Sequence, residues 1–239
     1  MYNPIRYILE WLLPYTCVFC GAPGHEKLDL CKDCSKELPW LEHACPRCAQ
    51  PYSAYQTDVQ LCGTCLKDPP PYDNTIATFI YQKPVDYLIG GLKFHSQLVY
   101  ARLLSELLLQ SLNQHYQPSN RPQMIIPMPL HKTRLRERGF NQAVELARPI
   151  AKLWGIPISL HDCQRIRATP AQLELPAKQR RKNVKNAFQV QKNFHFEHVA
   201  ILDDVITTGS TVQELSLQLR RQGVKKIDVW CCAKTGAIT

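Results

Sequence analysis

The stretch that decides the fold is "HVAILDDVITTGSTVQEL", residues 198–215. An apolar run stops at Asp203 and Asp204, and small hydroxylated residues around Gly209 then lead into a helical pattern. This order predicts a buried strand, a short turn and the start of a helix. Open α/β sheets bind ligands at the carboxyl ends of their strands, so the two aspartates are expected beside a ligand.

The turn after the acidic pair has the composition of a phosphate-binding loop. Backbone N–H groups at a helix start have no partner within the helix, and a glycine lets a ligand approach closely. The two carboxylates lie one step back along the chain, within reach of sugar hydroxyls. Together these features describe a site for a 5-phosphoribosyl group. The alternative is a strand end with an ordinary Asp, Thr or Ser helix cap, which requires neither both aspartates nor this order.

Apolar strands alternate with helical patterns through the rest of this region. Strands are predicted at 75–81, 123–129, 198–204 and 225–233, and helices at 97–116, 140–155 and 210–223. This alternation predicts an α/β fold with a mostly parallel sheet flanked by helices.

The amino-terminal part of the chain is rich in cysteine. Eight of the 11 cysteines form four C-x-x-C pairs within the first 65 residues. Two such pairs complete a tetrahedral zinc site, so two structural zinc ions are predicted. Sequential and crossed pairing both satisfy eight ligands, and the spacing leaves both open. The expected ligands are Cys17, Cys20, Cys31, Cys34, Cys45, Cys48, Cys62 and Cys65.

A secreted disulfide framework is the alternative for these cysteines. No signal peptide is recognised before them, which favours zinc in a reducing cytoplasm. No run of 18 apolar residues is present, so no membrane span is predicted.

Composition divides the chain into four parts. Residues 1–14 form a short amphipathic segment, 15–66 a double zinc-ribbon domain, 67–74 a proline-rich linker and 75–239 the α/β domain. The apolar stripe of the first segment is expected to dock on the protein itself, on a partner, or on the inner face of the cytoplasmic membrane.

The net charge of +9 is concentrated in two segments. Residues 131–138 and 164–186 together account for all of it. Localised positive charge suits phosphates, on a small molecule or on nucleic acid. The alternative interpretation is two solvated faces.

Taken together, these motifs resemble the ComF family, whose members combine an amino-terminal zinc ribbon with a type I phosphoribosyltransferase domain. The resemblance also rests on "GGLKF" (90–94), "PMPLHKTRLRERGFNQA" (127–143), "RIRATPAQ" (165–172) and "RRKNVKNAF" (180–188). It implies a type I phosphoribosyltransferase-like fold and a role in natural transformation, where incoming DNA reaches the cytoplasm as a single strand. The implied partners are single-stranded DNA, a phosphoribosyl ligand, and DNA-uptake or recombination proteins.

The resemblance also implies residue roles around 5-phosphoribosyl diphosphate (PRPP) and Mg²⁺. Asp203 and Asp204 hold the ribose hydroxyls. The 5′-phosphate loop is Thr207, Thr208, Gly209, Ser210 and Thr211. The pyrophosphate loop and its cations are Pro129, Leu130, His131, Arg134, Arg136 and Arg138. A hood at 164–186 supplies Arg165, Arg167, Arg180, Arg181 and Lys182 for phosphates or DNA.

Two function classes follow from these assignments. The first is a DNA-handling protein that binds a phosphoribosyl ligand. The second is an enzyme that transfers phosphoribosyl from PRPP, with Mg²⁺ and cations neutralising the departing diphosphate. No acceptor pocket and no catalytic residue is identified, and the fold alone does not establish turnover.

Overall fold

A computed structural model of the 239-residue chain describes residues 14–52, 60–168, 184–192 and 194–236. The chain divides into two compact units, Met1–Pro39 and Trp40–Thr239. This division falls between the first two C-x-x-C pairs and the last two, whereas the sequence analysis groups all four in residues 15–66. The amphipathic segment 1–14 lies outside the described residues, except for Pro14.

A four-stranded parallel sheet forms the centre of the second unit. Its order is β1 (Asn74–Ile80), β6 (Lys226–Lys234), β5 (His198–Ile206) and β2 (Met124–Pro127). Both central strands are buried along most of their length, as expected for parallel strands covered on both faces. The predicted α/β fold with a parallel sheet is therefore confirmed. Strand β5 continues two residues beyond the predicted end, because its pairing with β6 extends to Ile206 and Lys234.

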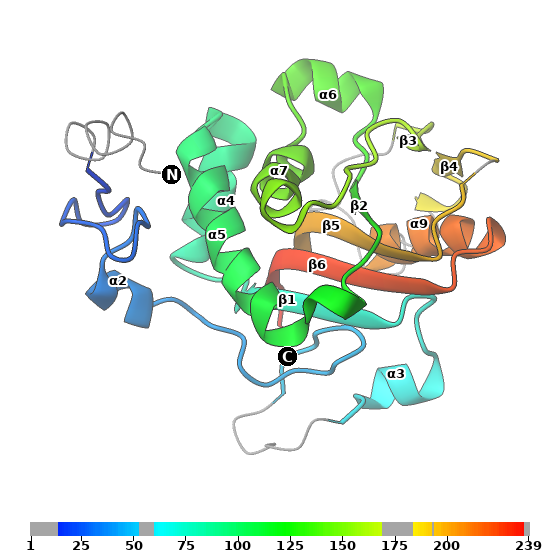
Figure 1. Ribbon diagram of the computed structural model, residues 1–239, viewed down its shortest axis with the longest axis horizontal. Helices are drawn as coiled ribbons and strands as arrows, with labels where there is room; N and C mark the ends of the chain where they lie inside the picture. The colour runs from blue at the N-terminus through cyan, green and yellow to red at the C-terminus, as the bar shows by residue number, and fades with distance from the viewer. Residues whose placement is uncertain (1–13, 53–59, 169–183, 193, 237–239) are drawn as a thin grey trace. The chain divides into compact units, whose positions relative to one another are not determined.

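The predicted helices cover this sheet. Helices α5 (Leu98–His115) and α7 (Gln142–Trp154) pack against each other and on the sheet. Helix α9 (Ser210–Arg221) joins β5 to its neighbour β6. Helix α7 joins β2 to Ile158, which forms a parallel bridge with Ile125 of β2. These two steps run in opposite directions along the sheet, so right-handed crossovers place α7 and α9 on opposite faces. In Figure 1, α9 lies apart from the group formed by α4, α5 and α7.

Several elements are not predicted by the sequence analysis. Helices α4 (Val85–His95) and α6 (Lys132–Arg138) precede and follow the strand β2, and β3 (Cys163–Arg165) pairs antiparallel with β4 (Phe188–Val190). Two glycines interrupt the apolar pattern of α4, and α6 is almost entirely charged, so neither has a clear helical periodicity. Among the described residues, no helix is long and apolar enough to cross a membrane.

Described residues of the segment 40–73 are attached to the edge strand β1. The backbone N–H and the hydroxyl of Thr75 donate to the carbonyls of Pro46 and Arg47, at 2.9 and 2.7 Å. The rings of Trp40 and Phe79 pack with their centroids 4.8 Å apart. The second group of cysteines therefore belongs to the same folded unit as the sheet.

The predicted linker, residues 67–74, is also held within this unit. Pro70 and Tyr72 are buried. The guanidinium of Arg220 in α9 donates to the carbonyl of Pro71 at 2.9 Å and to a carboxylate oxygen of Asp73 at 2.6 Å. These contacts fix the segment against α9.

A buried polar cluster lies at the amino edge of the sheet. The carboxylate of Asp228 accepts hydrogen bonds from Tyr116 at 2.7 Å and Asn74 at 3.0 Å, and lies 2.7 Å from Nε2 of His198. Burial acts to raise the pKa of Asp228, but these hydrogen bonds outweigh it, and the net shift is downward. This edge is therefore fixed by structural polar contacts, opposite the edge where the acidic pair lies.

Close packing between α4 and α5 depends on one of two adjacent glycines. A Cβ atom on Gly91 would lie 2.4 Å from Cε2 of Tyr100, whereas a Cβ on Gly90 would meet nothing within 4 Å. We expect Gly91→Ala to lower the free energy of unfolding by about 1–3 kcal/mol, because Tyr100 or α4 must shift. Gly90→Ala is the matched control, expected to be neutral or to stabilise by up to about 1 kcal/mol. Urea unfolding of both variants tests this, and equal midpoints would contradict it.

Candidate functional site

The acidic pair lies near the carboxyl end of β5, where the sequence analysis places it. Asp204 is 2% exposed, whereas Asp203 is only partly buried. The backbone N–H of Asp204 donates to Oδ1 of Asp203 at 2.9 Å. The two side chains therefore have different environments, and Asp203 is the one accessible to a ligand.

A lysine missed by the sequence analysis neutralises the buried member of the pair. The ammonium of Lys93, in α4, contacts Oδ2 of Asp204. The amide of Gln142, at the start of α7, donates to Oδ1 of Asp204 at 3.4 Å and accepts from the guanidinium of Arg138. The hydrogen-bonded network thus joins the strand end to α4, α6 and α7.

This environment drives the pKa values of the two carboxyls apart. Burial acts to raise the pKa of Asp204, but the charge of Lys93 and the hydrogen bonds outweigh it, and its pKa is lowered. Burial and the charge of Asp204 raise the pKa of Asp203 well above its usual value. Asp204 is thus held ionised, and Asp203 is the carboxyl that gains or loses a proton.

Two of the predicted arginines, Arg138 and Arg165, lie within electrostatic range of the pair, and Arg134 lies within range of both of them. Burial lowers the pKa of Arg138; the charge of Asp204 opposes this shift and that of Arg134 adds to it. Burial likewise lowers the pKa of Arg165, where Asp203 opposes the shift. A backbone bridge between His131 and Arg165 brings the base of the hood beside the start of α6. Arg134 forms an ion pair with Glu137 at 3.5 Å, and the three cations Lys93, Arg138 and Arg165 outnumber the two aspartates, so the site attracts anions.

The other predicted cations are placed differently. Arg136 is exposed on α6. The guanidinium of Arg167 donates to the carbonyl of Lys185 at 2.7 Å. The remaining three, Arg180, Arg181 and Lys182, lie outside the described residues.

The predicted phosphate loop connects β5 to α9. Gly209 has a φ of 74° and precedes the first residue of α9, where it offers no side chain to cap the helix. The hydroxyls of Thr208 and Ser210 lie 2.8 Å apart, and the ammonium of Lys234 donates to the carbonyl of Thr207 at 2.8 Å. Thr211 follows in the first turn of α9. The loop is therefore fixed from β6 and leaves the helix start open to an anion.

The predicted pyrophosphate loop follows β2 at the same edge of the sheet. The backbone N–H of Met128 donates to the carbonyl of Leu202 at 2.7 Å, which ties the loop to β5. After Pro129 and Leu130, the imidazole of His131 accepts from the backbone N–H of Thr133 at 3.3 Å and caps α6. The loop thus leads into α6, whose Arg138 lies within electrostatic range of Asp203.

Lys93, Gln142 and Lys234 are the main site residues without an assigned role in the sequence analysis. Lys93 belongs to "GGLKF", and a lysine inside an apolar helix is a signal that could have found it. Lys234 follows directly after the predicted strand 225–233, whereas the observed strand β6 includes it. Its position at the carboxyl edge of the sheet therefore became clear only from the observed end of β6.

The eight paired cysteines form two compact groups. Cys17, Cys20, Cys31 and Cys34 make one, and Cys45, Cys48, Cys62 and Cys65 make the other, with ligand atoms within 4.8 Å of one another in each. The four pairs therefore associate sequentially, which resolves the alternative left open by the spacing. His25 and His43 are exposed and belong to neither group.

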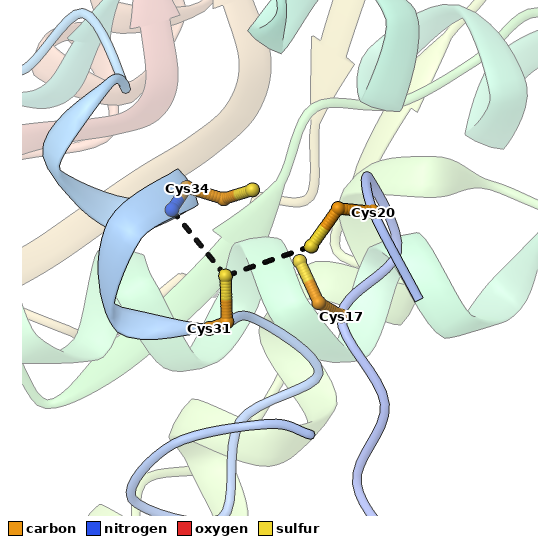
Figure 2. A group of neighbouring side chains, drawn as sticks. All are labelled: Cys17, Cys20, Cys31 and Cys34. Carbon is orange, nitrogen blue, oxygen red and sulfur yellow. Dashed lines mark hydrogen bonds between the residues drawn. The ribbon is translucent and has the colours of Figure 1, made fainter. Parts of the chain in front are cut away.

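The geometry of the sulfurs fits tetrahedral zinc. The Sγ atoms of Cys20 and Cys31 are 3.7 Å apart, and those of Cys48 and Cys62 are 3.6 Å apart. Four sulfurs at about 2.3 Å from one zinc ion are about 3.8 Å from each other. Figure 2 shows the first group, in which the side chains from two segments converge. The residues therefore fit two closed, structural zinc sites.

Both groups use the same backbone turn. In the first, the N–H of Gly21 donates to the carbonyl of Cys17 at 2.9 Å; in the second, the N–H of Ala49 donates to that of Cys45 at 2.8 Å. Cys31 and Cys62 then occupy equivalent positions, immediately before the short helices α2 (Lys32–Lys36) and α3 (Gly63–Lys67). The two ribbons are thus structural repeats in different units.

Without a cation, two thiols of the second group favour the protonated form. Burial raises the pKa of Cys65, and the neighbouring Cys48 raises it further. Burial also raises the pKa of Cys48, to about 11. Four thiolates at such short range therefore require a positive ion between them.

We expect two zinc ions per chain. Cys31→Ser is expected to remove one ion and to leave the other, because each group has its own four ligands. Elemental analysis of purified protein measures this directly. One ion or none in the unmodified protein would contradict the two-site arrangement.

Comparison with known proteins agrees with both parts of the chain. The model of the double zinc ribbon domain matches residues 8–70. The chain is 37% identical over 226 residues to Competence protein F of Haemophilus influenzae, covering 92% of this chain and 97% of that protein. It is 33% identical over 226 residues to DNA utilization protein YhgH of Salmonella typhimurium, covering 93% and 98%. It is 23% identical over 198 residues to Competence protein ComFC of Bacillus subtilis, covering 81% of this chain and 79% of that protein.

Proposed function

Since the chain belongs to the ComF family, we propose that it binds a 5-phosphoribosyl ligand and handles single-stranded DNA during DNA uptake. The relatives are named competence and DNA utilization proteins, which supports a role with DNA. The proposed setting is the cytoplasm, where DNA-uptake or recombination proteins are the expected protein partners.

One observation carries the ligand proposal. An accessible carboxylate, Asp203, lies near the carboxyl end of β5, in the strand that leads into the glycine turn at Gly209, and within the field of Arg138 and Arg165. The turn supplies backbone donors for a phosphate, and the carboxylate accepts hydrogen bonds from sugar hydroxyls. A sugar phosphate satisfies both groups at once, which an isolated phosphate would not.

The residues present also fit a second anionic group and a metal ion. Arg138 lies near the pair and Arg134 lies near Arg138, and guanidiniums can bind a diphosphate bidentately. Mg²⁺ binds through one or two carboxylates together with phosphate oxygens, and Asp203 offers the accessible carboxylate. When bound, Mg²⁺ would neutralise diphosphate charge. The chain's own residues orient the sugar and hold the phosphates.

The ligand is tested by calorimetric titration with PRPP and Mg²⁺. We expect saturable binding of PRPP and weaker binding of ribose 5-phosphate or diphosphate alone, because each of these fills part of the site. Equal affinity for diphosphate and PRPP would contradict a role for the sugar. Addition of nucleobases or amines, with measurement of released diphosphate, then distinguishes binding from transfer to an acceptor.

DNA binding is tested by its salt dependence. If phosphates contact the cations of α6 and β3, log affinity for a single strand falls linearly with log salt, by about 0.7 per phosphate neutralised. Changing Arg134 and Arg136 together to alanine should flatten this slope by up to about 1.4. The matched control is Lys152→Ala with Arg221→Ala, two exposed cations near the carboxyl ends of α7 and α9. Equal slopes for both pairs would place the DNA elsewhere.

A further inference from the structure

Phe94 is a large apolar side chain that the fold leaves in solvent beside the acidic pair. Its exposed fraction is 66%, whereas Leu88, Ile89 and Leu92 of the same helix are completely buried. Phe94 directly follows Lys93, whose ammonium contacts Asp204. The core of the protein therefore does not use this ring, although its backbone neighbour belongs to the site.

Two sets of contacts link the ring to the same carboxylate. Lys93 provides the first. In the second, Cζ of Arg138 lies 5.9 Å from the centroid of the Phe94 ring, within the range of a cation–π contact. Arg138 in turn donates to Gln142, which donates to Asp204. The ring is thus positioned by the network that builds the proposed ligand site.

More exposed apolar surface continues along α4 and α5. Tyr87 lies seven residues before Phe94, on the same side of α4, and is 58% exposed. Leu98, at the start of α5, is 53% exposed. The Tyr87 ring is itself held by Tyr100, with centroids 5.8 Å apart. An aromatic surface that includes a ring beside Arg138 of α6 combines the two features that proteins use to bind single strands, stacking faces and cations.

We propose that Phe94 is a stacking platform for a base of single-stranded DNA whose phosphates contact the arginines of α6. This inference rests on the proposed function, because it assumes that the basic surface receives a DNA strand. It adds that the base as well as the phosphate is held, without base-specific hydrogen bonds. Every base has a π face, so sequence preference is expected to be slight.

The test compares two strands with the same phosphates. One is a thymidine oligomer of about 20 nucleotides, and the other is the same backbone without bases. Phe94→Ala is expected to weaken binding of the thymidine oligomer about 5- to 100-fold, the range for loss of one stacked base. It should leave affinity for the abasic strand and the salt slope unchanged, because no charge is removed.

Three further variants separate stacking from general apolar contact. Phe94→Trp should retain binding, whereas Phe94→Leu should behave like Phe94→Ala. Leu153→Ala is the control, because Leu153 is also 66% exposed but lies near the carboxyl end of α7. Melting temperatures of all variants, measured without DNA, show that each is folded.

The outcomes distinguish this inference from the function on which it rests. If the unmodified protein binds neither strand, both are wrong. If it binds and Phe94→Ala binds equally well, DNA handling stands and stacking on Phe94 is wrong. Equal loss of affinity for both strands, or full retention of binding by Phe94→Leu, would also show that stacking on Phe94 is wrong. A change in oligomeric state of Phe94→Ala with unchanged DNA affinity would assign the ring to contact between copies of the chain.

Discussion

Cys62→Ser is expected to lower the melting temperature of the sheet unit, whereas Cys31→Ser is expected to leave it unchanged. The two cysteines occupy equivalent positions in the two ribbons, and each substitution removes one ligand of one zinc site. Only the second ribbon lies in the same unit as the sheet, where Thr75 of β1 bonds to Pro46 and Arg47. Loss of the zinc therefore releases the backbone that supports an edge strand.

The expected size is large because closed zinc sites contribute folding free energy directly. A loss of about 3 kcal/mol lowers the melting temperature of a unit of this size by about 6–12 °C. The buried Trp154 and Trp230 report on the sheet through their fluorescence. Both variants should bind one zinc ion fewer, so metal content is matched between them. An equal fall in both variants, or no fall in Cys62→Ser, would contradict the assignment of the second ribbon to the sheet unit.

The cysteine pattern illustrates what the sequence could and could not predict. Spacing identified all eight ligands, because two thiolates three residues apart can hold one metal. It could not show that the second ribbon is attached to the sheet, since that depends on contacts between Trp40 and Phe79 and between Thr75 and Pro46. Such contacts join residues far apart in sequence and have no periodic signature. The proline-rich segment 67–74 indicated a linker by composition, yet Arg220 of α9 holds it in place.

At the ligand site, too, the sequence predicts local features but not contacts between residues far apart in the chain. The strand, the turn and the acidic pair follow from local pattern, and so they were predicted with nearly correct bounds. The partner of Asp204 was not, because Lys93 comes from a helix more than 100 residues earlier in the chain. Consequently the sequence analysis gave the two aspartates the same role. In the structure, Asp204 has Lys93 as its counter-ion and Asp203 is accessible.

This difference predicts opposite effects of two conservative substitutions on stability. Asp203→Asn is expected to be neutral or stabilising at neutral pH, because it removes a carboxylate whose pKa is raised by burial and by Asp204. Its advantage over the unmodified protein should shrink as the pH falls through the pKa of Asp203, since the protonated acid resembles the amide. The same substitution should weaken binding of PRPP about 10- to 100-fold, because the amide nitrogen of Asn cannot accept a hydrogen bond from a ribose hydroxyl.

Asp204→Asn is expected to lower the free energy of unfolding by about 2–4 kcal/mol, because it leaves the ammonium of Lys93 without its charge partner. The pKa of Asp204 is lowered in the folded protein, so its contribution is present above the unfolded pKa of about 3.9 and is lost as the pH falls further. Adding Lys93→Met should restore part of the loss, because the double variant has no unpaired charge. Urea unfolding of the two single variants and the double variant at neutral pH measures this coupling. Additive effects of Asp204→Asn and Lys93→Met would mean that the two residues do not form a pair. A larger loss of stability for Asp203→Asn than for Asp204→Asn would reverse the roles assigned to the two carboxylates.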